Sequence, residues 1–295
     1  MFEGIITPMV TPFHYDDNQS INYEAAEKLI DYLINKGVSG IFILGSNGEF
    51  HVIDEDEKIE FTKRVVKYVN HRVPVFVGTG TCSTRETIRL SKKAEELGAD
   101  AISVISPYFI KISDEELYQH FKAIAKSVKI PMILYNIPRN TGINISADVL
   151  ERLSSIENVK GIKDSSRDLD NLKGYLEVAK KHNMSVLIGS DSIIFKGCQM
   201  GASGAISGMS NVITDTLVNL YKALKSNDLK KAEKLQQDIE VIRNVVKLKT
   251  NPSVIKRAME LAEIAPVGPA RKPVLEMDEL TDMKIKEMLK YFHLI

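Results

Sequence analysis

The sequence predicts an α/β protein in which eight parallel strands close into a (β/α)8 TIM barrel that carries a C-terminal helical appendage. Eight short apolar runs occur between residues 4 and 207 without strict polar alternation, as expected for strands buried on both faces. Longer amphipathic segments separate them, and strand–helix units in series with right-handed crossovers favour a closed barrel. The first run lacks the Gly-rich fingerprint of a doubly wound sheet, which is the competing architecture.

The predicted strands are short and rich in Val, Ile and Leu. They are GIITPMV from residue 4, GIFIL from 40, PVFVG from 74, AISVI from 101, PMILY from 131, VKGIK from 159, VLIG from 186 and GAIS from 204. Such runs suit the buried strands of a parallel sheet.

Helix start and stop signals lie between these strands. Leu29, Ile30, Leu33 and Ile34 form one apolar stripe, and Gly37 stands where that helix should stop. Ser83 with Glu86 and Ser113 with Glu116 fit the capping-box spacing, and Asp54 with Glu57 opens a further helix. The gap between the last two strands has room only for a short helix around Ile193–Met200.

The residues after the eighth strand exceed the single helix that closes a barrel. They predict helices near Asn211–Lys225, Asp228–Lys247, Pro252–Leu261 and Glu279–Tyr291, with the Pro-rich stretch APVGPARKP before the last one. We therefore expect a barrel over residues 1–225 and a helical extension over 226–295 that packs on it as part of one structural unit.

Composition limits the partners of the protein. Lys and Arg total 39 of the 295 residues, as do Asp and Glu, so the formal net charge is zero. This balance gives no electrostatic reason to expect nucleic acid or an anionic membrane as partner. The only cysteines, Cys82 and Cys198, make no disulfide framework, and the acidic, Pro-containing N-terminus does not look like a secretory leader. We expect a soluble cytoplasmic protein.

The active site of such a barrel should lie at the C-terminal ends of the strands. Only one predicted strand ends in a lysine, Lys163, and alternation places Val159, Gly161 and Lys163 on one face. Burial there would disfavour the charged ammonium form and leave a neutral amine as a carbonyl nucleophile. The alternative is that Lys163 reaches the rim and pairs with Asp164 or Asp191.

The neighbouring strand ends in Tyr135, whose side chain should face the same way as Lys163. Its hydroxyl would then be placed to transfer protons. The alternative is an aromatic side chain that simply packs under a helix.

The short loop at 45–49, Gly-Ser-Asn-Gly-Glu, exposes backbone N–H groups and leads to a helix, a geometry that can bind a carboxylate or phosphate. By itself this pattern also fits a plain turn. The six histidines show no paired spacing near strand ends, so no metal site is expected.

Three segments, GSNGE at 45–49, YNIPRNTG at 135–142 and GIKDSS at 161–166, occur in this order along the chain. They resemble the G-[ST]-x-G-E loop, the Y-N-x-P-x-x-[ST]-G segment and the G-[IV]-K-[DEQ] Schiff-base motif of the dihydrodipicolinate synthase/N-acetylneuraminate lyase family of class I pyruvate-dependent aldolases. The resemblance runs essentially end to end.

The resemblance implies a tetrameric barrel enzyme that needs no cofactor, because Lys163 itself forms an imine with pyruvate. Tyr135 would shuttle protons, Ser46 and the N–H of Asn47 would grip the pyruvate carboxylate, and Ile206 would line the pocket through its backbone. The remaining expected substrate contacts are Gly48, Tyr108, Arg139, Asn140, Asp164, Ser165, Ser190 and Asp191.

Departures from the family pattern bear on the substrate. The synthases usually have two threonines where Ser46 and Asn47 stand, a relay tyrosine at Phe109, and a substrate-binding arginine at Asn140. GIFILGSNGEF, ISPYF and KDSS look closer to the 2-keto-3-deoxygluconate aldolase branch.

We therefore expect a lyase that cleaves or forms a 2-keto-3-deoxy sugar acid from pyruvate and an aldehyde, with poor synthesis of dihydrodipicolinate. One alternative is 4-hydroxy-tetrahydrodipicolinate synthase, a condensing enzyme of lysine biosynthesis, and others are a keto-acid dehydratase or N-acetylneuraminate lyase. The remote alternative is a barrel that binds a small molecule without catalysis.

Overall fold

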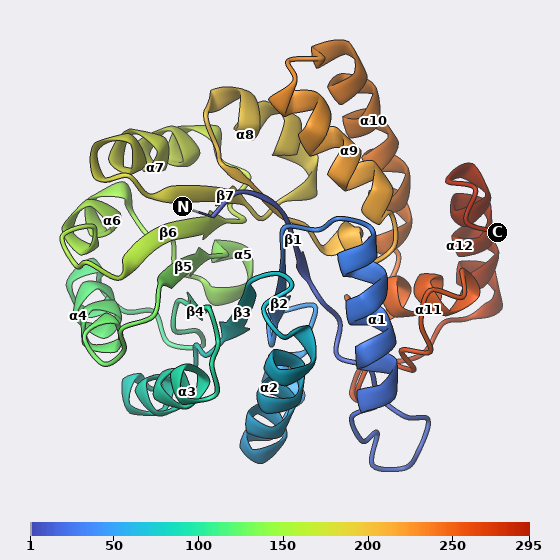
Figure 1. Cartoon of the computed structure of the whole chain (residues 1–295), viewed down its shortest axis with the longest axis horizontal. Coiled ribbons are helices and arrows are strands. Elements are labelled where there is room, and N and C mark those ends of the chain that lie inside the picture. The colour runs from blue at the N-terminus through green and yellow to red at the C-terminus, as the bar shows by residue number, and fades with distance from the viewer. Residues whose placement is uncertain (1) are drawn as a thin grey trace.

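The computed structural model describes residues 2–295 and contains a closed barrel in which every strand is parallel to its neighbours (Figure 1). Strand order follows the chain, and β8 pairs with β1 through Ile206 and Ile6. The strands are β1 (Gly4–Pro8), β2 (Gly40–Ile43), β3 (Val75–Gly78), β4 (Ala101–Ile105), β5 (Met132–Asn136), β6 (Val159–Asp164), β7 (Ser185–Ile188) and β8 (Gly204–Ile206). The predicted TIM barrel is confirmed, and each strand lies within one of the eight apolar runs or overlaps it.

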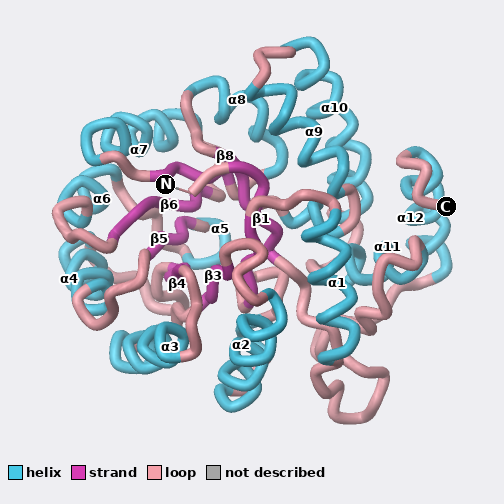
Figure 2. The backbone as a smooth tube through the Cα atoms, in the orientation of Figure 1, coloured by secondary structure: helices cyan, strands magenta, loops and turns pink. Residues whose placement is uncertain are grey.

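Helices surround the barrel (Figure 2). Those between strands are α1 (Tyr23–Asn35), α2 (Glu55–Val69), α3 (Thr84–Glu96), α4 (Asp114–Ala125), α5 (Pro138–Thr141), α6 (Ala147–Leu153), α7 (Leu169–His182) and α8 (Ile194–Met200). After β8 come α9 (Thr214–Lys225), α10 (Leu229–Val246), α11 (Ser253–Leu261) and α12 (Glu279–Tyr291). The short α8 and the ends of α12 agree with the predictions, whereas the predictions include neither α5 nor α6.

Local side-chain contacts set several helix starts. The predicted capping box is present at Ser113 and Glu116, and Asp54 with Glu57 forms another. At Ser83 only half of the predicted box forms: its hydroxyl accepts the N–H of Glu86, but its own N–H donates to Thr81 Oγ1 at 3.1 Å. The competing threonine explains the difference.

Helix α9 starts three residues later than the predicted Asn211. Residues Gly208–Asn211 form a 3₁₀ turn instead. Asn211 is held there because its side-chain amide donates to the carbonyls of Pro8 and Gly208 at 3.0 and 2.9 Å.

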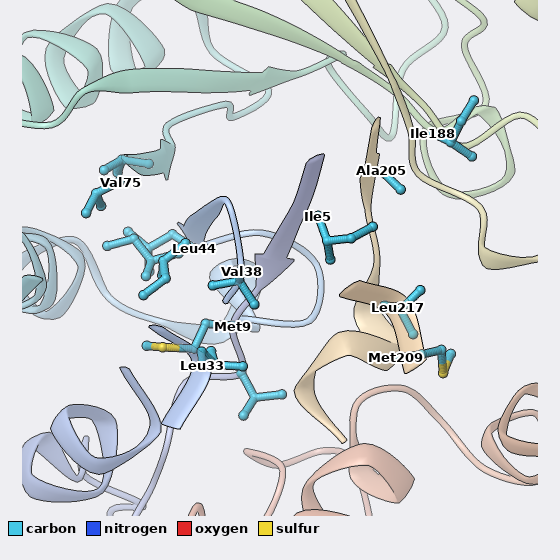
Figure 3. Close-up of a cluster of buried hydrophobic side chains, with 14 of the residues drawn as sticks. Ile5, Met9, Leu33, Val38, Leu44, Val75, Ile188, Ala205, Met209 and Leu217 are labelled. Atoms are coloured by element: carbon cyan, nitrogen blue, oxygen red, sulfur yellow. The ribbon is translucent and has the colours of Figure 1, made fainter. Parts of the chain in front are cut away.

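Two apolar clusters hold the barrel together. The smaller one fills the barrel interior and comprises Ile6, Phe42, Phe76, Ala101, Ile133, Leu187 and Ile206. The larger one lies between the strands and the surrounding helices; Figure 3 shows part of it, with Ile5 and Ala205 on strands and Leu33 and Leu217 on helices. Strand residues therefore alternate between two buried layers, which is why the runs are apolar without interruption.

The C-terminal helices cover one side of the barrel. Helix α10 packs against α9 and α12, and α11 packs against α12, with α11 and α12 lying beyond α1 in Figure 1. The boundary near residue 225 stays a prediction. Within residues 2–295, no helix combines the length and apolar character that a bilayer crossing demands.

Candidate active site

Lys163 and Tyr135 lie side by side at the C-terminal end of the barrel. The two residues are register partners in the parallel pair of β5 and β6. The Nζ atom of Lys163 lies 3.8 Å from the centre of the Tyr135 ring and 5.1 Å from that of Phe42. Each of the two side chains is only 4% exposed. The predicted adjacency of the amine and the phenol is therefore present in the fold.

Within residues 2–295, the amine of Lys163 forms no ion pair. No carboxylate lies within 4 Å of its Nζ atom in the described part of the chain, so the alternative of an ion pair with Asp164 or Asp191 is not observed. Gly189 makes room for the lysine stem, because a Cβ atom at this position would lie 3.0 Å from Lys163 Cε. A buried amine that is free of ion pairs can act as a nucleophile.

The loop at 45–49 reaches the same point from β2. The hydroxyl of Ser46 lies 3.4 Å from that of Tyr135. Within residues 2–295, the backbone N–H groups of Ser46, Asn47 and Gly48 have no acceptor, so they are available to an anion. The loop thus combines a hydroxyl with free N–H donors beside the buried amine.

This loop has a strained backbone that the surrounding structure holds in place. Leu44, just before the loop, and Glu49, its last residue, both have positive φ, at +56° and +58°. A non-Gly residue in this region costs of order 1–3 kcal/mol and persists where other contacts fix it. One such contact is the hydroxyl of Thr11, which donates to the carbonyl of Gly48 at 2.6 Å.

Ile206 lies on β8, two strands along the barrel from the β6 strand that carries Lys163. It ends β8 and is 1% exposed, within the same interior cluster as Phe42. An apolar floor of this kind keeps water from the amine.

Polar side chains line the rim after β6, β7 and β8. The Ser207 hydroxyl donates to the Asp191 carboxylate, and Arg167 donates to Ser190 Oγ at 3.0 Å. Burial raises the pKa of Asp191 above its ordinary value, against the Ser207 hydrogen bond and the charges of Arg243 and Lys163. Ser165 Oγ is buried with no hydrogen-bond partner in the described chain. This part of the rim offers polar groups to a bound substrate.

Asp164 points away from this group, since it alternates with Lys163 along β6. Its carboxylate accepts hydrogen bonds from the Asn136 amide at 3.0 Å and from the Ser166 hydroxyl at 2.9 Å. Burial raises the pKa of Asp164. The bond from Asn136 joins the ends of β5 and β6, which favours a scaffolding role for Asp164 over the predicted substrate contact.

The other predicted substrate contacts lie farther out. Arg139 and Asn140 are exposed on α5, and their side chains make no hydrogen bond or ion pair within residues 2–295. Tyr108 is half-buried with its ring 6.2 Å from that of Phe50, and burial raises its pKa to about 12. The next residue, Phe109, has φ +79° and is 92% exposed.

Sequence reasoning missed two residues outside the 45–49 loop that hold it, Asn251 and Lys256. Asn251 donates to Asn47 Oδ1 at 2.6 Å, and Lys256 forms a buried ion pair with Glu49 at 2.8 Å. Glu49 was visible only as the end of a motif, and nothing local distinguishes Asn251 or Lys256 from other polar residues of the C-terminal helices. No group of three or more His, Cys, Asp or Glu side chains is placed to hold a metal ion within residues 2–295.

The chain is similar along its whole length to proteins of one family. Residues 1–292 match the model of the "Dihydrodipicolinate synthetase family". A 4-hydroxy-tetrahydrodipicolinate synthase from Archaeoglobus fulgidus is 36% identical over 297 residues, which covers 100% of both chains.

Solved structures are similar over the whole chain. A prophage protein of the dihydrodipicolinic acid synthase family from E. coli, solved in complex with pyruvate, superposes with a TM-score of 0.94 at 35% identity and 100% coverage of both chains. A structure described as the first monomeric dihydrodipicolinate synthase variant has a TM-score of 0.95 at 32% identity, covering 100% of this chain and 98% of its own.

Proposed function

This chain belongs to the dihydrodipicolinate synthetase family, and we propose that it makes or breaks a carbon–carbon bond between pyruvate and an aldehyde through a Schiff base at Lys163. The family predicted from the three sequence motifs is thereby confirmed. Its members are class I pyruvate-dependent aldolases and lyases that join pyruvate to a lysine and use no additional cofactor.

The observation that carries the proposal is the isolated, buried amine of Lys163 beside the ring of Tyr135. In the proposed reaction Lys163 attacks the C2 carbonyl of pyruvate, and the carbonyl oxygen leaves as water to give an imine. Loss of a methyl proton then gives an enamine, whose carbon attacks the aldehyde. Hydrolysis of the product imine restores the free amine.

Two further groups have proposed roles in these steps. The Tyr135 hydroxyl donates and accepts the protons, and its neighbour Ser46 Oγ at 3.4 Å supports a proton path toward the bound carboxylate. The free N–H groups of Ser46 and Asn47 bind that carboxylate, as backbone N–H groups in turns bind anions elsewhere.

Borohydride reduction in the presence of pyruvate tests the proposal. It should inactivate the enzyme irreversibly and attach a three-carbon acid to Lys163, seen as a mass increase on the peptide that contains GIKDSS. Lys160 provides the control, because it lies on the same strand but is exposed. A label on Lys160 or another lysine, or the absence of any label, would refute the proposed mechanism.

The names of relatives supply one candidate for the aldehyde. Three relatives that are 34%, 32% and 36% identical to the chain are named 4-hydroxy-tetrahydrodipicolinate synthase, which supports condensation of pyruvate with aspartate semialdehyde. The names thus favour the alternative function over the predicted sugar-acid cleavage.

Two observations favour the second candidate, a 2-keto-3-deoxy sugar acid. Asn140 stands where the resemblance places a cationic clamp for the carboxylate of the semialdehyde, and its side chain has no charge to offer. The hydroxyl of Ser165, which has no hydrogen-bond partner within residues 2–295, lies near Lys163, because a Cβ at Gly189 would approach Ser165 Oγ to 2.1 Å and Lys163 Cε to 3.0 Å. A hydroxylated substrate would satisfy this buried hydroxyl.

Measuring kcat/KM for both reactions on one preparation separates the candidates. A synthase rate that is higher by about tenfold or more identifies the lysine-biosynthetic reaction, and the reverse ratio identifies the sugar-acid lyase. Omitting pyruvate in the synthesis assay controls for background consumption of the aldehyde.

We also infer that the enzyme is a cytoplasmic homotetramer, a dimer of dimers. Phe109 and Ile110 are 92% and 64% exposed side by side after β4, an apolar pair that a second copy would cover. Sedimentation or light scattering at micromolar concentration measures the mass directly. A monomer that stays active at assay concentration would contradict the assembly.

A further inference from the structure

We propose that Asn251, Lys256 and Glu49 are positioning residues for pyruvate, through which the C-terminal helices hold the 45–49 loop in the conformation that binds the substrate carboxylate. The inference rests on the proposed role of that loop. None of the three residues needs to touch the substrate, because each acts through Asn47 or through the loop backbone.

Glu49 anchors the loop from its C-terminal end. It is 1% exposed, and its carboxylate faces Lys256 Nζ at 2.8 Å and accepts the backbone N–H of Arg271 at 2.8 Å. Its positive φ of +58° gives it a strained backbone that these contacts can maintain. The end of the substrate loop is therefore fixed by two residues more than 200 positions away in the sequence.

Lys256, which makes this contact with Glu49, is buried in the protein interior. It is 1% exposed on α11, donates to the carbonyl of Pro269 at 2.7 Å, and lies 4.2 Å from the centre of the Phe13 ring. Burial lowers its pKa to about 8, while the charge of Glu49 acts in the opposite direction. Burying a charged pair carries a large desolvation cost, and apolar residues at such positions often stabilise a fold equally well or better. A role in fixing the loop explains why a charged pair is present at this buried position.

Asn251 holds the middle of the loop. Asn251 lies in the segment just before α11, and its side-chain amide donates to Asn47 Oδ1 at 2.6 Å. Gly208 bounds Asn47 on another side, since a Cβ at Gly208 would lie 2.5 Å from Asn47 Nδ2. Asn47 is thus held between two fixed neighbours while its backbone N–H remains free.

These contacts leave the backbone N–H groups of the loop free to bind a carboxylate. They restrain the side chains of Asn47 and Glu49 next to those groups. A carboxylate site that is ordered before pyruvate arrives binds more tightly than one that must become ordered on binding. The positioning role therefore predicts a change in pyruvate affinity, whereas a purely structural role predicts a change in stability alone.

The measurement is the pyruvate concentration that gives half-maximal borohydride trapping, together with KM, kcat and Tm for the full-length enzyme. Asn251→Ala removes one exposed side chain and should raise that concentration about three- to tenfold, with Tm and kcat nearly unchanged. Lys256→Met should raise it by about tenfold or more, and Lys256→Arg should restore part of the affinity because it keeps the charge.

Asp282→Asn is the matched control. It breaks the ion pair between Asp282 and Arg257, which joins α11 to α12 next to Lys256 but does not reach the substrate loop. We expect it to lower Tm without altering pyruvate trapping. Equal half-saturation in wild type, Asn251→Ala and Lys256→Met would overturn the inference. If Lys256→Met does not fold, Asn251→Ala alone decides, and absence of trapping in the wild type would instead refute the Schiff-base function.

Discussion

The amine of Lys163 lies 3.8 Å from the centre of the Tyr135 ring because the two residues are partners in the parallel register of β6 and β5. The hydroxyl of the same ring lies 3.4 Å from Ser46 Oγ. One aromatic ring thus connects the nucleophile with the loop proposed to bind the carboxylate.

Tyr135→Phe should lower kcat by about 10²–10⁴-fold, because general acid–base transfer is typically worth that much. Pyruvate trapping should persist at similar half-saturation, since only a hydroxyl is lost and the ring that packs on Lys163 remains. Steady-state kinetics and borohydride trapping measure the two effects. Tyr68→Phe, which removes a hydroxyl bonded to Asp31 far from the site, is the control. Near-normal turnover in Tyr135→Phe would assign the proton transfer to water or another group.

Asn140→Arg should raise kcat/KM for aspartate semialdehyde by about tenfold while leaving reactions with uncharged aldehydes unchanged. An arginine can form a bidentate, charge-assisted contact with a carboxylate that asparagine cannot. Arg139→Gln in the native background shows whether the neighbouring arginine already serves this purpose. If kcat/KM for aspartate semialdehyde does not rise in Asn140→Arg but falls in Arg139→Gln, then Arg139 is the residue that binds the carboxylate of the semialdehyde.

Dialysis against a chelator should leave turnover intact. The protonated imine itself withdraws electrons from the bound pyruvate, which is the task a metal ion performs in other aldolases. Activity is measured before and after dialysis, with buffer-dialysed enzyme as the reference. Loss of turnover that a divalent ion restores would contradict the imine mechanism.

His120 should make the fold sensitive to mild acid. Burial lowers its pKa to about 4, and among the described residues its ring has a hydrogen-bond partner only at Nδ1, which faces Thr84 Oγ1. Between pH 6.5 and 4 the unfolded chain binds a proton that the native chain does not, so the free energy of unfolding falls as pH falls. From pH 8 to 5 the loss from this one group is about 2 kcal/mol.

From pH 8 to 5, the free energy of unfolding of His120→Gln should therefore fall by about 2 kcal/mol less than that of wild type, as measured by urea unfolding. The comparison within each variant cancels any general destabilisation by the substitution. His71→Gln, at an exposed histidine, should follow the wild-type curve. Parallel pH profiles for His120→Gln and wild type would show that the buried ring is protonated in the native state.

The sequence by itself determined the barrel and the positions of its catalytic candidates. Strands such as VKGIK and PMILY carry their own signals, because burial on both faces demands continuous apolar residues and because alternation fixes which side chain points inward. Chain order in a barrel then makes Lys163 and Tyr135 neighbours. The loop at 45–49 was recognisable from its glycines and its motif.

Only the tertiary structure decided how that loop is held. The contacts of Asn251 with Asn47 and of Lys256 with Glu49 both join residues that are more than 200 positions apart in the sequence. A buried lysine in a helix has the same local pattern as an exposed one, so no periodicity identifies it. Its environment comes from how α11 packs against the barrel, a long-range arrangement that local propensity and short motifs do not encode.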